Sequence, residues 1–119
     1  MRNAQVQILN AADTASVNGA AIDVNQAVSA SFQIVCGDVT AAGTVKLQVS
    51  NDIVSNGGDR KNFVPTNWSD IPNATSTVAS GVGPAIVIGN MCFSYIRAVY
   101  TRTSGGSTTI VVNMNYLSI

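Results

Sequence analysis

The fold is decided by residues 94–117, SYIRAVYTRTSGGSTTIVVNMNYL. Both halves of this stretch carry apolar side chains at every second position: Ile96, Ala98 and Tyr100, then Ile110, Val112, Met114 and Tyr116. A two-residue period is typical of β-strands that bury one face. The Ser-Gly-Gly-Ser stretch between the halves is typical of a hairpin loop, so we expect the two strands to pair directly.

The same period continues toward the N-terminus. It covers residues 28–36, through Val28, Ala30, Phe32, Ile34 and Cys36, and residues 44–50, through Val45, Leu47 and Val49. Shorter strand candidates are residues 5–9, 20–24, 75–80 and 85–88. About eight short strands separated by turns predict an all-β fold, an antiparallel β-sandwich that is immunoglobulin-like or jelly-roll-like. We expect one domain over residues 1–119, since this length suits a single core.

Charge is scarce in this chain. Only 10% of the residues are charged and the formal net charge is zero. The lysines and arginines are scattered, so we expect no nucleic-acid partner. No apolar run approaches the ~20 residues that cross a bilayer, so we expect no membrane contact and a chain that stays in the cytoplasm where it is made. A weakly charged surface lacks mutual repulsion, which favours contact with other copies and predicts a homo-oligomer.

The sequence lacks the usual groups of catalytic chemistry. It contains no histidine and no glutamate. Without histidine no Ser-His-Asp triad is possible, and no phosphate-binding GxxxxGK[ST] loop occurs in the sequence. We therefore expect neither an enzyme nor a cofactor. Asp52, Asn56 and Asp59 offer oxygen ligands, but their spacing does not match a calcium loop. Turn formation explains these residues better, and we expect no metal site.

Two cysteines, Cys36 and Cys92, lie far apart in the sequence. In a chain that is not secreted, buried thiols on core strands are the favoured interpretation. A disulfide between the two cysteines is the alternative.

Candidate contact residues lie on the polar side of residues 44–52, TVKLQVSND, and after it. The long segment of residues 53–65 exceeds what a hairpin requires, and such loops are often contact sites. Trp68 could be an interface or sugar-stacking anchor, but core packing is the favoured interpretation. Tyr95 and Tyr100 point to opposite faces of one strand, so we expect at most one of them in the core. The interface candidates are Lys46, Gln48, Arg60, Lys61, Phe63, Trp68, Tyr95 and Arg97.

The order of VKLQVSND (45–52), NWSDIP (67–72) and FSYIRAVYTRTSGGSTTIVVNMNY (93–116) resembles a group of small bacteriophage virion proteins. This resemblance implies a β-sandwich protein of the head decoration, cement or fibre-base type, made in the host bacterial cytoplasm and located in the virion. Its implied partners are the major capsid protein or other virion proteins. The segment IVSNGGDRKNFVP (53–65) departs from the shorter members of that group.

A second similarity is to galactose-binding-like sandwiches of the discoidin type, which set a strand, an Asn-Trp turn and a Tyr-Ile-Arg strand in the same order. That similarity implies a carbohydrate-binding module or adhesin head as the alternative function. Trp68 and asparagine or aspartate side chains of the loop would then bind a glycan.

Overall fold

The computed structural model describes residues 2–12, 14–37, 42–54, 58–60, 62–78, 81–83, 85–104 and 109–119. These residues form strands and no helix, and so none of them forms a helix that could span a membrane. The strands are β1 (Arg2–Ala12), β2 (Val17–Asn18), β3 (Ile22–Asp23), β4 (Ala27–Cys36), β5 (Ala42–Ser50), β6 (Ser69–Val78), β7 (Gly81–Val82), β8 (Ile86–Ile88), β9 (Tyr95–Ser104) and β10 (Thr109–Ser118). The prediction of an all-β fold is confirmed.

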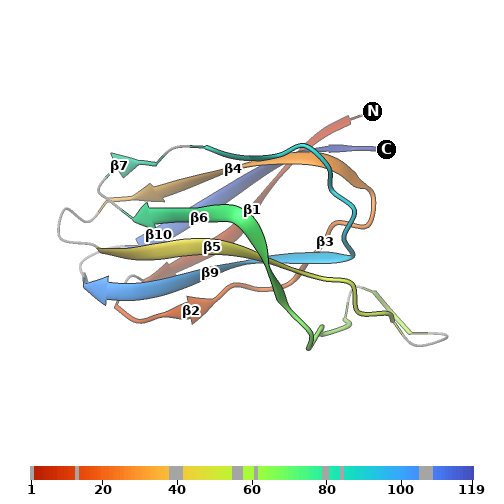
Figure 1. The fold of residues 1–119 in the computed structure, drawn as a ribbon, viewed down its shortest axis with the longest axis horizontal. Helices are drawn as coiled ribbons and strands as arrows, with labels where there is room; N and C mark the ends of the chain where they lie inside the picture. The colour runs from red at the N-terminus through yellow and green to blue at the C-terminus, as the bar shows by residue number, and fades with distance from the viewer. Residues whose placement is uncertain are drawn as a thin grey trace.

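The strands form two antiparallel sheets that pack face to face. Sheet A has the order β1-β10-β4, with β7 and β8 both paired to the far side of β4. Sheet B has the order β9-β5-β6, with β2 and β3 both paired to the other side of β9. Figure 1 looks onto sheet B, with β1 and β10 of sheet A behind it.

The topology is that of a jelly roll. Because β2 and β3 share one edge position and β7 and β8 share another, the chain fills eight strand positions. When these eight positions are numbered along the chain, the strand order is 1-8-3-6 in sheet A and 2-7-4-5 in sheet B. This order is the double Greek key of jelly rolls, so the structure selects the second of the two predicted sandwich types.

The predicted hairpin of residues 94–117 is wrong. β9 pairs with β2, β3 and β5 in sheet B, whereas β10 pairs with β1 and β4 in sheet A. The connecting residues 105–108 lie outside the described residues. A two-residue period indicates which face of a strand is buried, but it does not identify the neighbouring strand. Two consecutive strands with apolar faces can therefore pack across the core as well as side by side.

The core lies between the sheets, and the predicted inward faces largely supply it. Ala30, Phe32, Ile34 and Cys36 of β4, Val45, Leu47 and Val49 of β5, Ile96, Ala98 and Tyr100 of β9, and Ile110, Val112 and Met114 of β10 are all buried. Val28 and Tyr116 are the exceptions and are only half-buried. At Val28, a register shift near the start of β4 gives the inward position to Ala27. A bulge in β1 between Gln7 and Leu9 similarly allows two consecutive residues, Ile8 and Leu9, to be buried.

Candidate functional site

The segment between β5 and β6 is closed at its base by Asp52. The Asp52 carboxylate accepts hydrogen bonds from the backbone N–H groups of Thr66 (2.7 Å) and Asn67 (3.0 Å) and from Nδ2 of Asn67 (2.9 Å). The hydrogen bond from the Asn67 backbone, followed by the others, holds the pKa of Asp52 below its ordinary value. The described residues contain no cluster of three or more His, Cys, Asp or Glu suited to a metal ion. Asp52 closes the base of the segment across 14 to 15 residues, rather than bonding its own neighbours in a turn as expected. Asn56 lies outside the described residues.

The closed segment then returns over the outer face of sheet B and covers Tyr95. The Tyr95 hydroxyl donates a hydrogen bond to the backbone oxygen of Arg60 (3.0 Å), and the Phe63 ring lies 5.7 Å from the Tyr95 ring. Tyr95 is only 2% exposed, although it sits on the side opposite the core. The expectation that at most one of Tyr95 and Tyr100 belongs to the core is confirmed, since Tyr100 packs in the core cluster and Tyr95 does not. The burial of Tyr95 on the outer face was not expected. Strand periodicity does not report a loop that folds onto the outer face.

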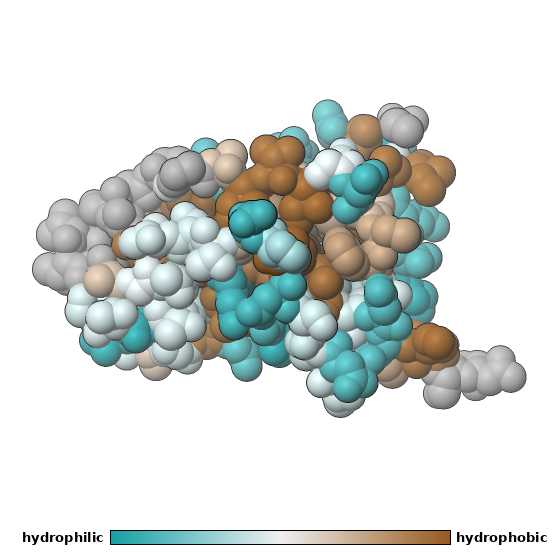
Figure 2. Space-filling view, in the orientation of Figure 1, coloured by the Kyte–Doolittle hydropathy of each residue, from teal (hydrophilic) through white to brown (hydrophobic). Residues whose placement is uncertain are grey.

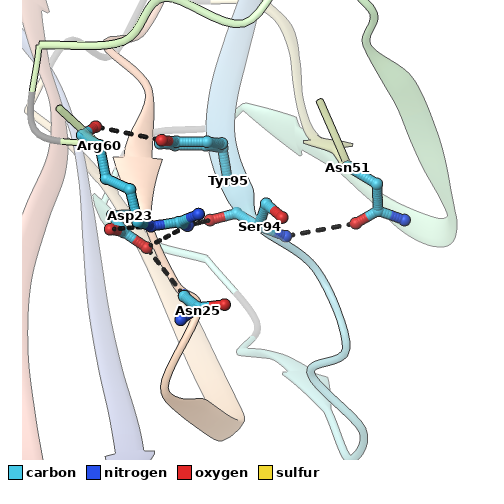
Figure 3. Close-up of polar contacts among 6 residues, drawn as sticks. All are labelled: Asp23, Asn25, Asn51, Arg60, Ser94 and Tyr95. Atoms are coloured by element: carbon cyan, nitrogen blue, oxygen red, sulfur yellow. Dashed lines mark hydrogen bonds and ion pairs between the residues drawn. The ribbon is translucent and has the colours of Figure 1, made fainter. Parts of the chain in front are cut away.

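Arg60 fastens this segment to the edge of sheet B (Figure 3). Its Nε and Nη2 bind the two carboxylate oxygens of Asp23 at 2.9 and 2.8 Å, and Nη2 also donates to the backbone oxygen of Ser94 at 3.3 Å. The guanidinium also lies over the Tyr95 ring, 4.9 Å from its centroid. The hydrogen bond between Arg60 and Asp23 lowers the pKa of the aspartate and raises that of the arginine. This bidentate pair links β3 to the β5–β6 segment.

Polar side chains form a chain across β6, β5 and β9. Lys46 Nζ lies 3.2 Å from Asp70, Gln48 Nε2 donates to Asp70 Oδ1 (2.8 Å), and Arg97 Nε donates to Gln48 Oε1 (2.9 Å). The hydrogen bond from Gln48, followed by that from Lys46, lowers the pKa of Asp70. Figure 2 shows this outer face, on which hydrophilic and neutral side chains lie around a hydrophobic area near the middle of the view. Each cross-strand pair of side chains is thus connected to the next pair, and together they tie the three strands to one another.

Trp68 lies at the end of this chain and is not a core residue. It is half-buried on the outer face, where the Arg97 guanidinium lies 4.4 Å from the centroid of its ring. Its Nε1 donates to the backbone oxygen of Pro65 (3.2 Å). The prediction that Trp68 packs in the core is therefore wrong. Its apolar surface is used against a cation and the β5–β6 segment.

All of the interface candidates except Lys61 are described, and the structure brings them together on the outer side of sheet B. Lys61 lies outside the described residues. Several of the others already form hydrogen bonds within the protein. Arg97 donates to Gln48, and Tyr95 donates to the backbone of Arg60. Gln48 and Arg60 also each bind an aspartate. Their use as an interface remains a prediction.

The outer face of sheet A was not among the sequence candidates. Its central positions carry Gln5, Gln7, Ser31, Gln33, Asn113 and Asn115, which we name the amide face. Asn115 lies between Gln5 and Ser31 in the register, and Asn113 lies between Gln7 and Gln33. These side chains line a depression of about 550 Å³. The sequence does indicate this face through the polar residues that alternate with apolar ones in residues 29–33 and 113–115. Alternation alone assigns them to strands and does not show that they lie side by side.

The amide face contains no charged residue, and its side chains are exposed except for the half-buried Ser31. The ion pairs among the described residues, Lys46–Asp70 and Arg60–Asp23, both lie on sheet B. The two outer faces therefore differ in character: sheet B carries internally paired charges and a covering segment, and sheet A carries an open array of neutral amides.

The cysteines do not form a disulfide. Cys36 is buried on β4, as expected, but Cys92 is exposed. Cys92 belongs to the irregular stretch before β9 rather than to a core strand.

No protein-family model matches this chain, and no curated protein matches it. The fold has a counterpart among solved structures. The crystal structure of SPBc2 prophage-derived protein YomS superposes with a TM-score of 0.58 over 98% of this chain and 94% of that chain, at 10% sequence identity. This likeness shows a shared fold.

Proposed function

We propose that this chain is a structural protein of a bacteriophage particle, a head decoration or cement subunit, and that it contacts its neighbours through the amide face of sheet A. The observation that carries the proposal is the exposed, charge-free array of glutamine and asparagine side chains on β1, β10 and β4. A rigid jelly roll with such a surface can bind neighbouring subunits through hydrogen bonds.

The chemistry of the amide face suits repeated contact. Each glutamine or asparagine both donates and accepts hydrogen bonds, so the face complements other neutral polar surfaces, including a second copy of itself. Burying neutral amides avoids the large desolvation cost of buried charge. Val87 on β8, opposite Ser31 in the register and 74% exposed, adds an apolar contact at the border of this face.

The edge beside the amide face is also open. β1 is the terminal strand of sheet A and is eleven residues long. The opposite edge of that sheet consists of the short strands β7 and β8, and the β6 edge of sheet B is interrupted by Pro72 and by Asn73 at φ 61°. Proline and irregular backbone block strand addition, whereas a regular edge permits it. β1 has one bulge, between Gln7 and Leu9, and is regular over residues 2–7 and 9–12. β1 thus extends the proposed contact surface.

Two observations support a phage particle as the setting. The ordered motifs of residues 45–52, 67–72 and 93–116 resemble small virion proteins. The jelly-roll fold is shared with a prophage-derived protein, although a fold alone hosts many functions. Many copies on a lattice would turn weak individual contacts into tight attachment.

The test uses capsids of the phage that encodes this chain, prepared without it. Purified protein should cosediment with these capsids and raise their melting temperature, because a ligand that binds only the assembled state stabilises it. Asn113→Lys, which places a charge at the centre of the amide face, should abolish both effects. Thr77→Lys, at an exposed position of β6, is the matched control and should retain them. Unchanged capsid melting at saturating protein would refute the cement role.

A further inference from the structure

A second surface feature lies on sheet B, where Arg97 and Trp68 meet. A depression of about 420 Å³ opens between the β2–β3 connection and the β5–β6 segment. Its lining consists of Asn18, Gly19, Ala20, Ala21, Asn62, Phe63, Val64, Pro65, Trp68 and Arg97. The volume falls within the range of small-ligand sites, ~300–1,000 Å³.

Arg97 differs from Lys46 and Arg60 in its partners. Lys46 and Arg60 each pair with an aspartate, whereas Arg97 has no carboxylate within ion-pair distance in the part of the chain that the structure describes. Its Nε donates a hydrogen bond to the neutral side chain of Gln48, and its guanidinium lies over the Trp68 ring. Its two Nη nitrogens have no hydrogen-bond partner among the described residues. Burial lowers the pKa of Arg97, which reflects a desolvated charge without a counter-charge.

The walls of the depression are built for a ring with polar edges. Phe63, Val64 and Trp68 offer apolar surface, and Asn18 and Asn62 offer amides. Nδ2 of Asn62 donates a hydrogen bond to the Asp59 carboxylate (2.9 Å), so Oδ1 of Asn62 can accept a hydrogen bond from a ligand hydroxyl. Aromatic surface combined with amides suits a sugar, which has an apolar C–H face and hydroxyl groups around its rim.

We propose that this depression binds a sugar that carries a carboxylate, with the carboxylate on the Nη nitrogens of Arg97 and the sugar ring against the apolar wall. Arginine binds carboxylates through two parallel hydrogen bonds, and Gln48 and Trp68 already hold the guanidinium in place. The proposal does not depend on the role of the amide face, because the two surfaces lie on different sheets.

Trp68 is the single tryptophan and so reports directly on this site. D-glucuronate should change the Trp68 fluorescence saturably at neutral pH and low salt, and D-glucose, which has the same ring without the carboxylate, should bind at least tenfold more weakly. Calorimetry of the same titrations provides a readout that does not depend on the indole. Absence of saturable glucuronate binding, or equal affinity for glucose, would overturn the proposal.

Variants locate the binding. Arg97→Lys should weaken glucuronate binding about tenfold, since an ammonium cannot form the two parallel bonds, and Arg97→Gln should weaken it further. Arg2→Gln removes the same charge from the exposed start of β1 and should leave binding unchanged. Far-ultraviolet dichroism and melting curves establish that each variant is folded. Full binding by folded Arg97→Gln, or tighter binding of a short aspartate-containing peptide than of glucuronate, would contradict a sugar carboxylate at Arg97.

Discussion

The Tyr95 hydroxyl donates a hydrogen bond to the backbone oxygen of Arg60, 3.0 Å away, and so ties the outer face of sheet B to the segment that connects β5 and β6. The contact is reinforced by the Arg60–Asp23 ion pair at 2.8 Å and by the Phe63 ring. A long connection that could have been loose is therefore docked at a defined place. The Arg97 depression depends on that docking, because one of its walls is the segment itself.

Tyr95→Phe should destabilise the protein by about 1 kcal/mol, since it leaves the Arg60 carbonyl without its donor while keeping the ring packing. Urea unfolding followed by dichroism measures this change. Proteolysis within the β5–β6 segment should become faster in the variant. Tyr116→Phe, at a half-buried position of β10, is the control. Equal stabilities of the Tyr95→Phe variant and the wild type would show that the hydrogen bond does not fix the segment.

Acid should release the same segment before the sandwich unfolds. Hydrogen bonds lower the pKa values of Asp52, Asp23 and Asp70 in the folded protein. A carboxyl whose folded pKa is depressed contributes stability above its ordinary pKa of ~3.9, and that contribution is lost as the pH falls through the folded value. Trp68 fluorescence should therefore be constant from pH 7 to pH ~4 and change only below that.

The acid transition has a matched variant. Asp52→Asn removes an ionisable group from the base of the segment, so the transition should become shallower and part of the stability at neutral pH should be lost. A fluorescence transition centred above pH 5 would contradict this account, because none of these aspartates has a raised pKa.

Gly43 tests the junction between β5 and β9. Its φ of +152° lies in a region that side chains rarely adopt, and a Cβ there would stand 2.2 Å from the backbone oxygen of Thr101. Gly43→Ala should cost about 2–3 kcal/mol, because backbone atoms must move. Gly89→Ala, where a Cβ would meet nothing within 4 Å, should change stability by less than about 0.5 kcal/mol. Thermal melting of the two variants side by side checks the contrast, and equal losses would refute it.

The buried faces of the long strands were predictable from sequence because burial on one side imposes a period of two. Leu47 and Val112 illustrate this, since both are fully buried where the alternation places them. The partner of each strand was not predictable in the same way. The apolar faces of β9 and β10 would look alike in a hairpin and in two facing sheets, and only the complete strand order distinguishes these arrangements.

The surfaces were harder to predict than the core. Tyr95 occupies an outward position of its strand, and only the fold of the β5–β6 segment explains why it is 2% exposed. Alternation placed Lys46, Gln48 and Arg97 on the polar sides of their strands. It did not show that β5 pairs with β9, or that β6 supplies Asp70 to Lys46 and Gln48. The amide face required the register of β1, β10 and β4, which joins residues from both ends of the chain.

The two thiols should differ sharply in reactivity, because Cys36 is 1% exposed on β4 whereas Cys92 is exposed before β9. A thiol reagent must reach the sulfur, so the native protein should be labelled once, at Cys92, and a second time only under denaturing conditions. Mass spectrometry of digested, labelled protein measures both sites. Cys92→Ser should abolish native labelling, and Cys36→Ser should leave it unchanged. Native labelling of Cys36 at a rate similar to that of Cys92 would show that the inner face of β4 is not buried between the two sheets.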